Sequence, residues 1–185
     1  MLDRAPDVSD DPAGEVAALT AVQRRIDHPS VVRAARAMSF FGEHAAGWIA
    51  LGAAGAALDP RRRRQWVTAT AGVVAAHGTS IAVKRVVRRP RPHDPRVAVH
   101  VGTPSRLSFP SSHATSTTAA AVLFGGLLGR PGAVLPTVPA MALSRLVLGV
   151  HYPTDVLAGS ALGVACALGA RRLIARGSVG RWRTA

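Results

Sequence analysis

Three stretches of this chain carry no Asp, Glu, Lys or Arg, and each is followed directly by a basic residue. The stretches cover residues 72–83, 114–129 and 156–170, and the residues that follow them are Lys84, Arg130 and Arg171. A helix of a soluble protein normally carries charged residues along its exposed face. The pattern therefore favours apolar helices that face lipid, with charges gathered at their ends.

The hydropathy pattern predicts an all-α, membrane-embedded helical bundle of about five transmembrane helices. The expected spans are 43–58, 66–83, 113–129, 133–150 and 155–170, and the fourth is interrupted by Pro136, Pro139 and the Ser144–Arg145 pair. Each span is shorter or less apolar than the roughly 20 residues that an isolated transmembrane helix needs, so a soluble all-helical core is the alternative. Two pairs of glycines at four-residue spacing, Gly125 with Gly129 and Gly159 with Gly163, favour close helix packing in lipid.

The two ends of the chain differ in composition from this bundle. Residues 1–12 are rich in Asp and Pro and predict a mobile tail rather than a secretory signal. Residues 13–41 predict an amphipathic helical segment, broken near His28, that lies along the bilayer surface or caps the bundle. Residues 42–176 then form the bundle, and residues 177–185 form a basic C-terminal tail.

The first polar segment that indicates chemistry runs from Lys84 to Pro92 and brings fixed cations. Pro90 and Pro92 restrict the residues before them to extended backbone, which fixes the chain on both sides of Arg91. A planar guanidinium held in this way suits bidentate binding of phosphate oxygens. A plain cluster of surface charge is the alternative for this segment taken alone.

The second segment, residues 109–113, precedes an expected helix of small residues. Ser111 or Ser112 suits an N-cap, and the free N–H groups of a helix N-terminus suit an anion. His113 beside such an anion is a candidate proton donor to a leaving oxygen.

The third segment, residues 144–155, is the most specific. Arg145 interrupts an apolar run, and an arginine in such a place needs an anionic partner. His151 and Asp155 lie four residues apart, so the carboxylate can hold one ring nitrogen while the other attacks phosphorus. A helix-capping Asp next to a solvated histidine is the simpler alternative.

Together the three segments resemble the motifs of the type-2 phosphatidic acid phosphatase superfamily. Its pattern reads Lys-x6-Arg-Pro, then Pro-Ser-Gly-His, then Ser-Arg-x5-His-x3-Asp. The first and third motifs match at every position, whereas Ser112 stands where the family usually has glycine. The motifs span residues 84–155, and the first 40 residues lie outside the resemblance.

The resemblance implies a division of roles among these residues. His151 would form a phosphohistidine intermediate, Asp155 would orient it, and His113 would protonate the leaving alcohol and then activate water. The residues that would hold the phosphoryl oxygens are Lys84, Arg91, Ser111, Ser112 and Arg145. The resemblance implies no metal and no cofactor, since the positive charge of such a site comes from the protein.

The expected substrate is a lipid phosphate, held by its apolar tail in the cell membrane that this multi-pass protein would cross. The wider sequence resembles an actinobacterial branch of the superfamily that acts on a polyprenyl-linked phosphate monoester in cell-wall arabinan supply. A polyprenyl diphosphate, phosphatidate or phosphatidylglycerophosphate is the alternative substrate. A vanadate haloperoxidase-like enzyme and a lipid-binding protein without turnover are further alternatives. A basic nucleic-acid-binding module would explain the net charge of +13 but not the histidines, so no nucleic-acid partner is expected.

Overall fold

The computed structural model describes residues 11–26 and 28–179, and this part of the chain is helical without strands. Most of the predicted N-terminal tail and the last six residues of the predicted C-terminal tail lie outside the described residues. In chain order the helices are α1 (Ala13–Arg25), α2 (Pro29–Gly42), η1 (Glu43–Ala45), α3 (Ala46–Leu58), η2 (Pro60–Arg62), α4 (Arg63–Val87), α5 (Ser112–Leu128), α6 (Pro131–Val134), α7 (Thr137–Val147) and α8 (Pro153–Val179).

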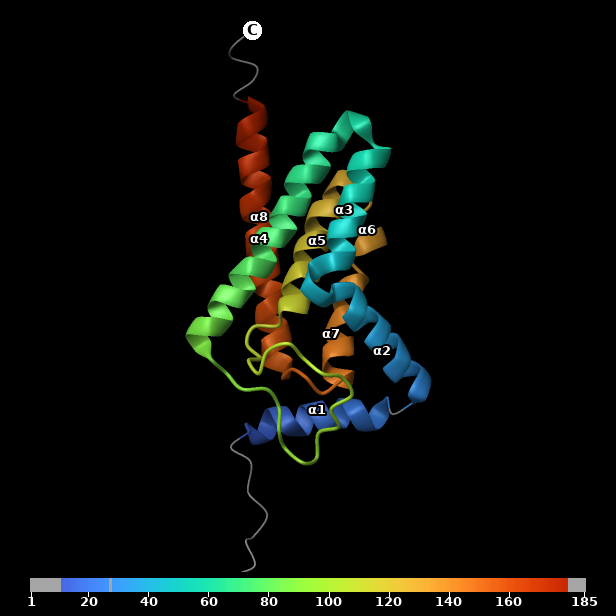
Figure 1. Ribbon diagram of the computed structural model, residues 1–185, viewed down its shortest axis with the longest axis vertical. Coiled ribbons are helices and arrows are strands. Elements are labelled where there is room, and N and C mark those ends of the chain that lie inside the picture. The colour runs from blue at the N-terminus through green and yellow to red at the C-terminus, as the bar shows by residue number, and fades with distance from the viewer. Residues whose placement is uncertain (1–10, 27, 180–185) are drawn as a thin grey trace, which may run out of the picture.

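Helix α5 is the centre of the bundle. It packs against α4 on one side and α8 on another, with α6 and α7 completing its surroundings, and Figure 1 shows these helices running roughly side by side. Nearly every residue of α5 from Ser112 to Gly125 is buried, including small polar residues such as Thr115 and Thr117. The uncharged stretch 114–129 is therefore the core helix of the fold.

Two of the four glycines singled out in the sequence bring α5 and α8 together. A Cβ on Gly159 would lie 2.6 Å from the Ser111 carbonyl oxygen, and one on Gly163 would lie 2.5 Å from the Thr115 carbonyl oxygen. Both contacts are too close for any side chain, so the prediction of close helix packing is confirmed at this pair. Gly129 differs, since it has a φ of 62° and caps the C-terminus of α5 without a neighbour within 4 Å.

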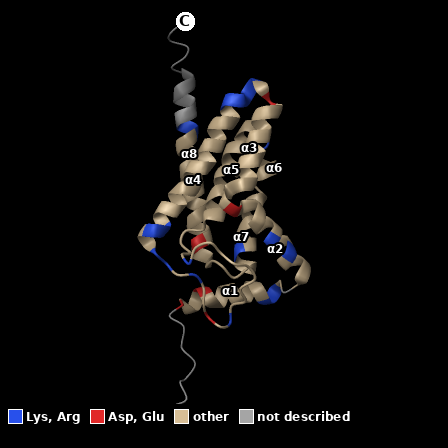
Figure 2. Ribbon diagram, viewed as in Figure 1, with Lys and Arg blue, Asp and Glu red and all other residues tan. Residues whose placement is uncertain are grey.

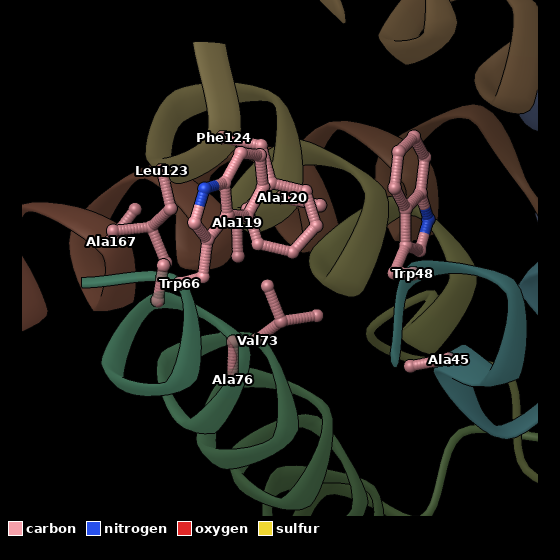
Figure 3. Close-up of a cluster of buried hydrophobic side chains, with 11 residues drawn as sticks. Ala45, Trp48, Trp66, Val73, Ala76, Ala119, Ala120, Leu123, Phe124 and Ala167 are labelled. Carbon is pink, nitrogen blue, oxygen red and sulfur yellow. The ribbon is translucent and has the colours of Figure 1, made fainter. Parts of the chain in front are cut away.

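Aromatic side chains and small apolar residues form a buried cluster in the bundle (Figure 3). The rings of Trp66 and Phe124 lie 5.4 Å apart, and those of Trp48 and Phe124 lie 6.4 Å apart. The indole N–H of Trp48 donates to the hydroxyl of Thr117 at 3.0 Å. This cluster ties α3 and α4 to α5 and leaves the other end of the bundle free for polar residues.

Charged residues gather at the two ends of the bundle, whereas the helix bodies between them are largely uncharged (Figure 2). The outward faces of the same helices expose large apolar side chains, among them Leu51, Val67, Val74, Leu157 and Val164. Within the described residues two helical stretches are long and apolar enough to cross a bilayer, namely Pro60–Val87 and Pro153–Arg172. An apolar belt between charged ends is the surface of a membrane protein.

The predicted spans differ from the observed helices in two places. The span expected over 133–150 with proline interruptions consists of two separate helices, since α6 ends at Val134 and the 11-residue α7 begins at Thr137. Pro136 and Pro139 lie at this break, and each lacks the backbone N–H that a continuous helix would use. The first expected span begins with the short helix η1, so its regular part is the 13-residue α3.

The N-terminal helices α1 and α2 cover the end of the bundle that carries the long loop 88–111 (Figure 1). On α1, Val16 and Leu19 pack against Tyr152. On α2, Ala35 packs against a cluster that includes Val150. Both flanks of His151 are therefore fixed by helices that the three sequence motifs do not contain.

Candidate active site

The three polar segments meet at one end of the bundle and line a cavity of about 290 Å³. Of the eight predicted site residues, six line this cavity: Lys84, Arg91, Ser112, His113, Arg145 and His151. Ser111 and Asp155 are fully buried and are not among the lining residues. Helix α4, the long loop, the start of α5, helix α7 and the α7–α8 turn each supply part of the wall.

His151 lies in the turn between α7 and α8, and its two ring nitrogens have different partners. Nδ1 is 3.4 Å from Oδ2 of Asp155, and Nε2 is 3.2 Å from Nη1 of Arg91. Burial, followed by the positive charges of Arg91, Lys84 and Arg145, holds the pKa of His151 well below its ordinary value. A proton on Nδ1 and a lone pair on Nε2 fit both contacts in a neutral ring that lines the cavity.

The turn that carries His151 depends on Gly149. Its φ of 68° is left-handed, and a Cβ there would lie 2.2 Å from the carbonyl oxygen of Ala98. Both conditions restrict this position to glycine. The chain can therefore turn sharply between Arg145 and His151 while it remains packed on the long loop.

Asp155 lies in the first turn of α8, fully buried behind His151. Its Oδ2 accepts a hydrogen bond from the backbone N–H of Tyr152 at 2.9 Å, and its Oδ1 accepts one from Arg89 at 3.0 Å. Arg89 thus holds Oδ1, the oxygen away from the imidazole, while the N–H of Tyr152 shares Oδ2 with His151. This is the arrangement of a residue that orients a histidine.

Three cations approach the cavity from different elements. Lys84, at the end of α4, donates from Nζ to the carbonyl oxygen of Ser108 at 2.7 Å. Arg91 donates to the carbonyl oxygens of Ser105 and Val150 at 2.7 and 2.6 Å, and burial lowers its pKa to about 10, so it stays charged at neutral pH. The backbone N–H of Arg91 also donates to the carbonyl of residue 106, so this segment is held in extended form as its prolines predict.

Arg145 is the most deeply buried cation, with 2% of its surface exposed. It donates from Nη2 to the hydroxyl of Ser144 at 2.8 Å, while its Nε has no hydrogen-bond partner. Within the described residues that line the cavity, no carboxylate forms an ion pair with Arg145. A buried guanidinium with unused donors fits an anion in the cavity.

The start of α5 contributes its two serines in different ways. Ser111 is the N-cap, and its hydroxyl accepts from the N–H of Ala114 at 3.4 Å. Ser112 begins the helix, lines the cavity and shares a hydrogen bond with the hydroxyl of Ser80 at 2.7 Å. Ser112 is absent from the residues with positive φ, so serine occupies the position of the family glycine without backbone strain.

His113 lies against the junction between α2 and η1. Its Nε2 is 3.1 Å from the carbonyl oxygen of Ser39 and 3.8 Å from Oε2 of Glu43. A Cβ on Gly42 would lie 2.6 Å from the imidazole ring, so the absence of a side chain there makes room for His113. Helix α2 therefore helps to place a histidine that the sequence assigned only to α5.

Two groups of residues at the site were not predicted from the sequence. Arg89 bridges Asp155 and Glu15, with Nη2 donating to Oε1 of Glu15 at 2.6 Å, and its guanidinium stacks 4.0 Å from the ring centre of Tyr152. Arg89 lies in the basic segment that the sequence analysis singled out, but the sequence did not indicate that it contacts Asp155 and Glu15. The second group is Glu43, His44 and His77, which line the cavity beside His113. Their positions depend on tertiary packing alone.

This chain also matches a known protein family. The family model of the PAP2 superfamily, the type-2 phosphatidic acid phosphatases, matches residues 65–177 of the chain. The chain belongs to the PAP2 superfamily. This membership explains why Lys84, Arg91, Arg145, His113 and His151 line one cavity although up to 67 positions separate them along the sequence.

Two named relatives are similar to this chain over most of their own length. Decaprenylphosphoryl-5-phosphoribose phosphatase of Mycolicibacterium smegmatis is 60% identical over 153 residues, which is 82% of this chain and 84% of the relative. The protein of the same name from Mycobacterium tuberculosis is 56% identical over 153 residues, covering 82% of this chain and 86% of the relative.

Two solved structures share the fold. The transmembrane phosphatidylglycerolphosphate phosphatase of Bacillus subtilis superposes with a TM-score of 0.72 at 20% identity, covering 90% of this chain and 89% of that one. LpxE of Aquifex aeolicus gives a TM-score of 0.71 at 18% identity, covering 88% and 97%. This chain therefore shares its all-helical bundle fold with both structures.

Proposed function

We propose that this protein is a metal-independent lipid phosphatase that hydrolyses a polyprenyl-linked phosphate monoester, decaprenylphosphoryl-5-phosphoribose. One observation carries the chemistry: a buried histidine has Asp155 at one ring nitrogen and Arg91 at the other, in a cavity that is also lined by Lys84, Arg85 and Arg145. The names of the two mycobacterial relatives support this substrate.

In the first step Nε2 of His151 attacks phosphorus and the bond from phosphorus to the ester oxygen breaks. His113 gives its proton to that oxygen, which leaves as the ribose alcohol. Arg91, Lys84 and Arg145 hold the equatorial oxygens, where a loose phosphoryl transition state carries its charge. Asp155 accepts a hydrogen bond from the Nδ1–H group, which stays on the ring, and stabilises the positive charge that develops on the imidazole.

In the second step water replaces the alcohol. His113, now neutral, takes a proton from the water, and the oxygen attacks the phosphohistidine. The bond between phosphorus and Nε2 breaks, which releases inorganic phosphate and restores His151. The overall reaction consumes one water and gives one alcohol and one phosphate. The positive charge in both steps comes from side chains of the protein.

The same proposal places the protein in the plasma membrane as a multi-pass protein. Helices α3, α4, α5 and α8 and the α6–α7 pair are five segments whose exposed faces are apolar and whose ends carry the charges. The segment 13–41 then lies at the membrane surface beside the cavity, and residues 42–176 form the phosphatase bundle. In this arrangement the polyprenyl chain stays in lipid while the phosphate reaches the cavity.

Phosphate release by the protein purified in detergent with a chelator tests this function. The substrates are a polyprenylphosphoryl-5-phosphoribose, a polyprenyl diphosphate, phosphatidylglycerolphosphate and phosphatidate. We expect kcat/KM to be highest for the phosphoribosyl lipid and turnover by His151→Ala to fall at least about a thousandfold, as for loss of a catalytic nucleophile. A preference for another lipid would contradict the substrate, and turnover that survives in His151→Ala would contradict the mechanism.

A further inference from the structure

Glu43 places a negative charge in a cavity whose other charged side chains are basic. Within the described residues that line the cavity, it is the one carboxylate, and it faces the same space as Lys84, Arg91 and Arg145. A carboxylate repels a bound phosphate. Its position is therefore easier to explain by a part of the ligand other than phosphate.

The oxygens of Glu43 keep unused capacity to accept hydrogen bonds. Oε1 is 3.5 Å from Nε2 of His44, and Oε2 is 3.8 Å from Nε2 of His113. Both distances exceed the approximately 3.2 Å of a well-formed hydrogen bond. The side chain is 37% exposed, so a ligand in the cavity can reach it.

The backbone around Glu43 takes conformations that side chains disfavour. His44 and Ala45 have φ values of 49° and 59°, in the left-handed region that residues with a Cβ rarely occupy. They follow Gly42, which packs on the ring of His113. Strained residues of this kind persist where the surrounding structure fixes them, and they cluster at ligand-binding positions. The strained turn here presents Glu43 to the cavity beside His113.

We propose that Glu43 recognises the leaving alcohol of the substrate by accepting hydrogen bonds from the free hydroxyls of its sugar. The inference rests on the proposed function, in which His113 protonates the ester oxygen. The C3 hydroxyl of the ribose lies on the third carbon counted from that oxygen, within reach of a carboxylate 3.8 Å from the His113 ring. Acidic side chains bind ribose hydroxyls in the same way in dinucleotide-binding folds.

This contact would make the enzyme prefer a lipid-linked sugar phosphate over phosphorylated lipids that lack hydroxyls near the ester. A hydrogen bond from a hydroxyl to a charged group changes a rate by about tenfold to hundredfold. Glu43 thereby sets specificity, while the cations and histidines, which contact only the phosphoryl group, act alike on every phosphate monoester.

The test compares two matched lipids: a polyprenylphosphoryl-5-phosphoribose, and the same lipid with hydrogen in place of both free ribose hydroxyls. kcat/KM is measured for the wild type, Glu43→Gln and Glu43→Ala. Asp59→Asn, which changes a carboxylate to an amide at the far end of the bundle, is the matched control. We expect the wild type and the control to prefer the hydroxylated lipid by about tenfold or more, and Glu43→Ala to reduce this preference to within about threefold. The effect of Glu43→Gln should be intermediate, because the amide keeps a neutral acceptor.

Two outcomes would overturn the inference, and they differ from each other. If both Glu43 variants lose activity equally on the two lipids, Glu43 acts through His113 and does not bind the sugar hydroxyls. If the wild type releases no phosphate from the hydroxylated lipid, the proposed function itself is wrong and the inference falls with it. Inorganic phosphate has no sugar, so it should still inhibit both variants. This measurement checks that the phosphate-binding cations Lys84, Arg91 and Arg145 are in place.

Discussion

Arg89 donates from Nη1 to Oδ1 of Asp155 at 3.0 Å, on the side of the carboxylate that faces away from His151. The same guanidinium donates from Nη2 to Glu15 at 2.6 Å, so helix α1 is linked through Arg89 to the candidate catalytic pair. Burial opposes the charge of Arg89, but the hydrogen bond that it donates to Glu15 and the charge of Asp155 raise its pKa above the ordinary value. Arg89 is thus a permanently charged support for Asp155.

Replacing Arg89 should lower kcat far more than it raises KM. Arg89→Met removes a charge-assisted hydrogen bond to a buried carboxylate, which corresponds to about 1.5–3 kcal/mol, or roughly a tenfold to hundredfold loss of kcat. Arg89→Lys should recover part of the rate. Arg88→Met is the matched control, because Arg88 is exposed. Steady-state phosphate release checks this, and an Arg89→Met enzyme with an unchanged kcat would exclude a positioning role.

The ionisation of His151 gives a prediction about pH. Its pKa is held well below 6.5, so the ring stays neutral as the pH falls through 6.5 and becomes protonated only in more acidic solution. The acid limb that His151 contributes to kcat/KM therefore lies below pH 6.5. Since the folded state disfavours the protonated ring, this group also makes the protein less stable as the pH falls below 6.5.

Histidine NMR titration checks this directly. Arg91→Met removes the cation 3.2 Å from Nε2, so it should shift the midpoint of His151 upward, toward its ordinary value. His151→Ala identifies the signal. A wild-type midpoint at or above 6.5 would contradict the prediction.

Ser112→Gly restores the residue that the superfamily usually has at this position, and it should leave kcat within about threefold, because the backbone N–H groups at the start of α5 stay in place. The variant should be less stable by about 1–2 kcal/mol, since it adds a glycine to a helix and removes the hydrogen bond to Ser80. Thermal unfolding in detergent measures this change. Ser112→Ala removes only the hydroxyl and should account for about half of the loss.

Gly149→Ala should be strongly destabilising. The left-handed φ and the 2.2 Å approach of a Cβ to the Ala98 carbonyl oxygen cannot both be relieved without moving the turn that carries His151. We expect a loss of about 2 kcal/mol or more in stability and a lower kcat. Gly126→Ala is the matched control, because that glycine lies inside α5 with open space around it, so alanine should be neutral or slightly stabilising. Equal effects of the two substitutions would contradict this account.

The sequence by itself determined the fold class and singled out the eight predicted site residues, six of which line one cavity. Uncharged stretches ending in basic residues are a local property of the chain, and they located α4, α5 and α8 because an apolar helix must face either a core or lipid. The four-residue spacing of His151 and Asp155 is also local. Their contact follows because His151 lies just before α8 and Asp155 lies in its first turn. The prolines in the apolar run 133–150 marked the interruption that separates α6 from α7, because each proline removes a backbone hydrogen bond from the helix.

Only the tertiary structure decided which residues contact the predicted site residues from other parts of the chain. Glu15 and Arg89 are 74 positions apart, and Glu43 and His113 are 70 apart. Their contacts depend on how α1 and α2 pack against the long loop and α5, which no periodicity in the chain records. The same packing separates Ser111, buried as a helix cap, from Ser112, which lines the cavity. Motif residues are specified by local spacing and chemistry, whereas their partners are specified by the packing of distant helices.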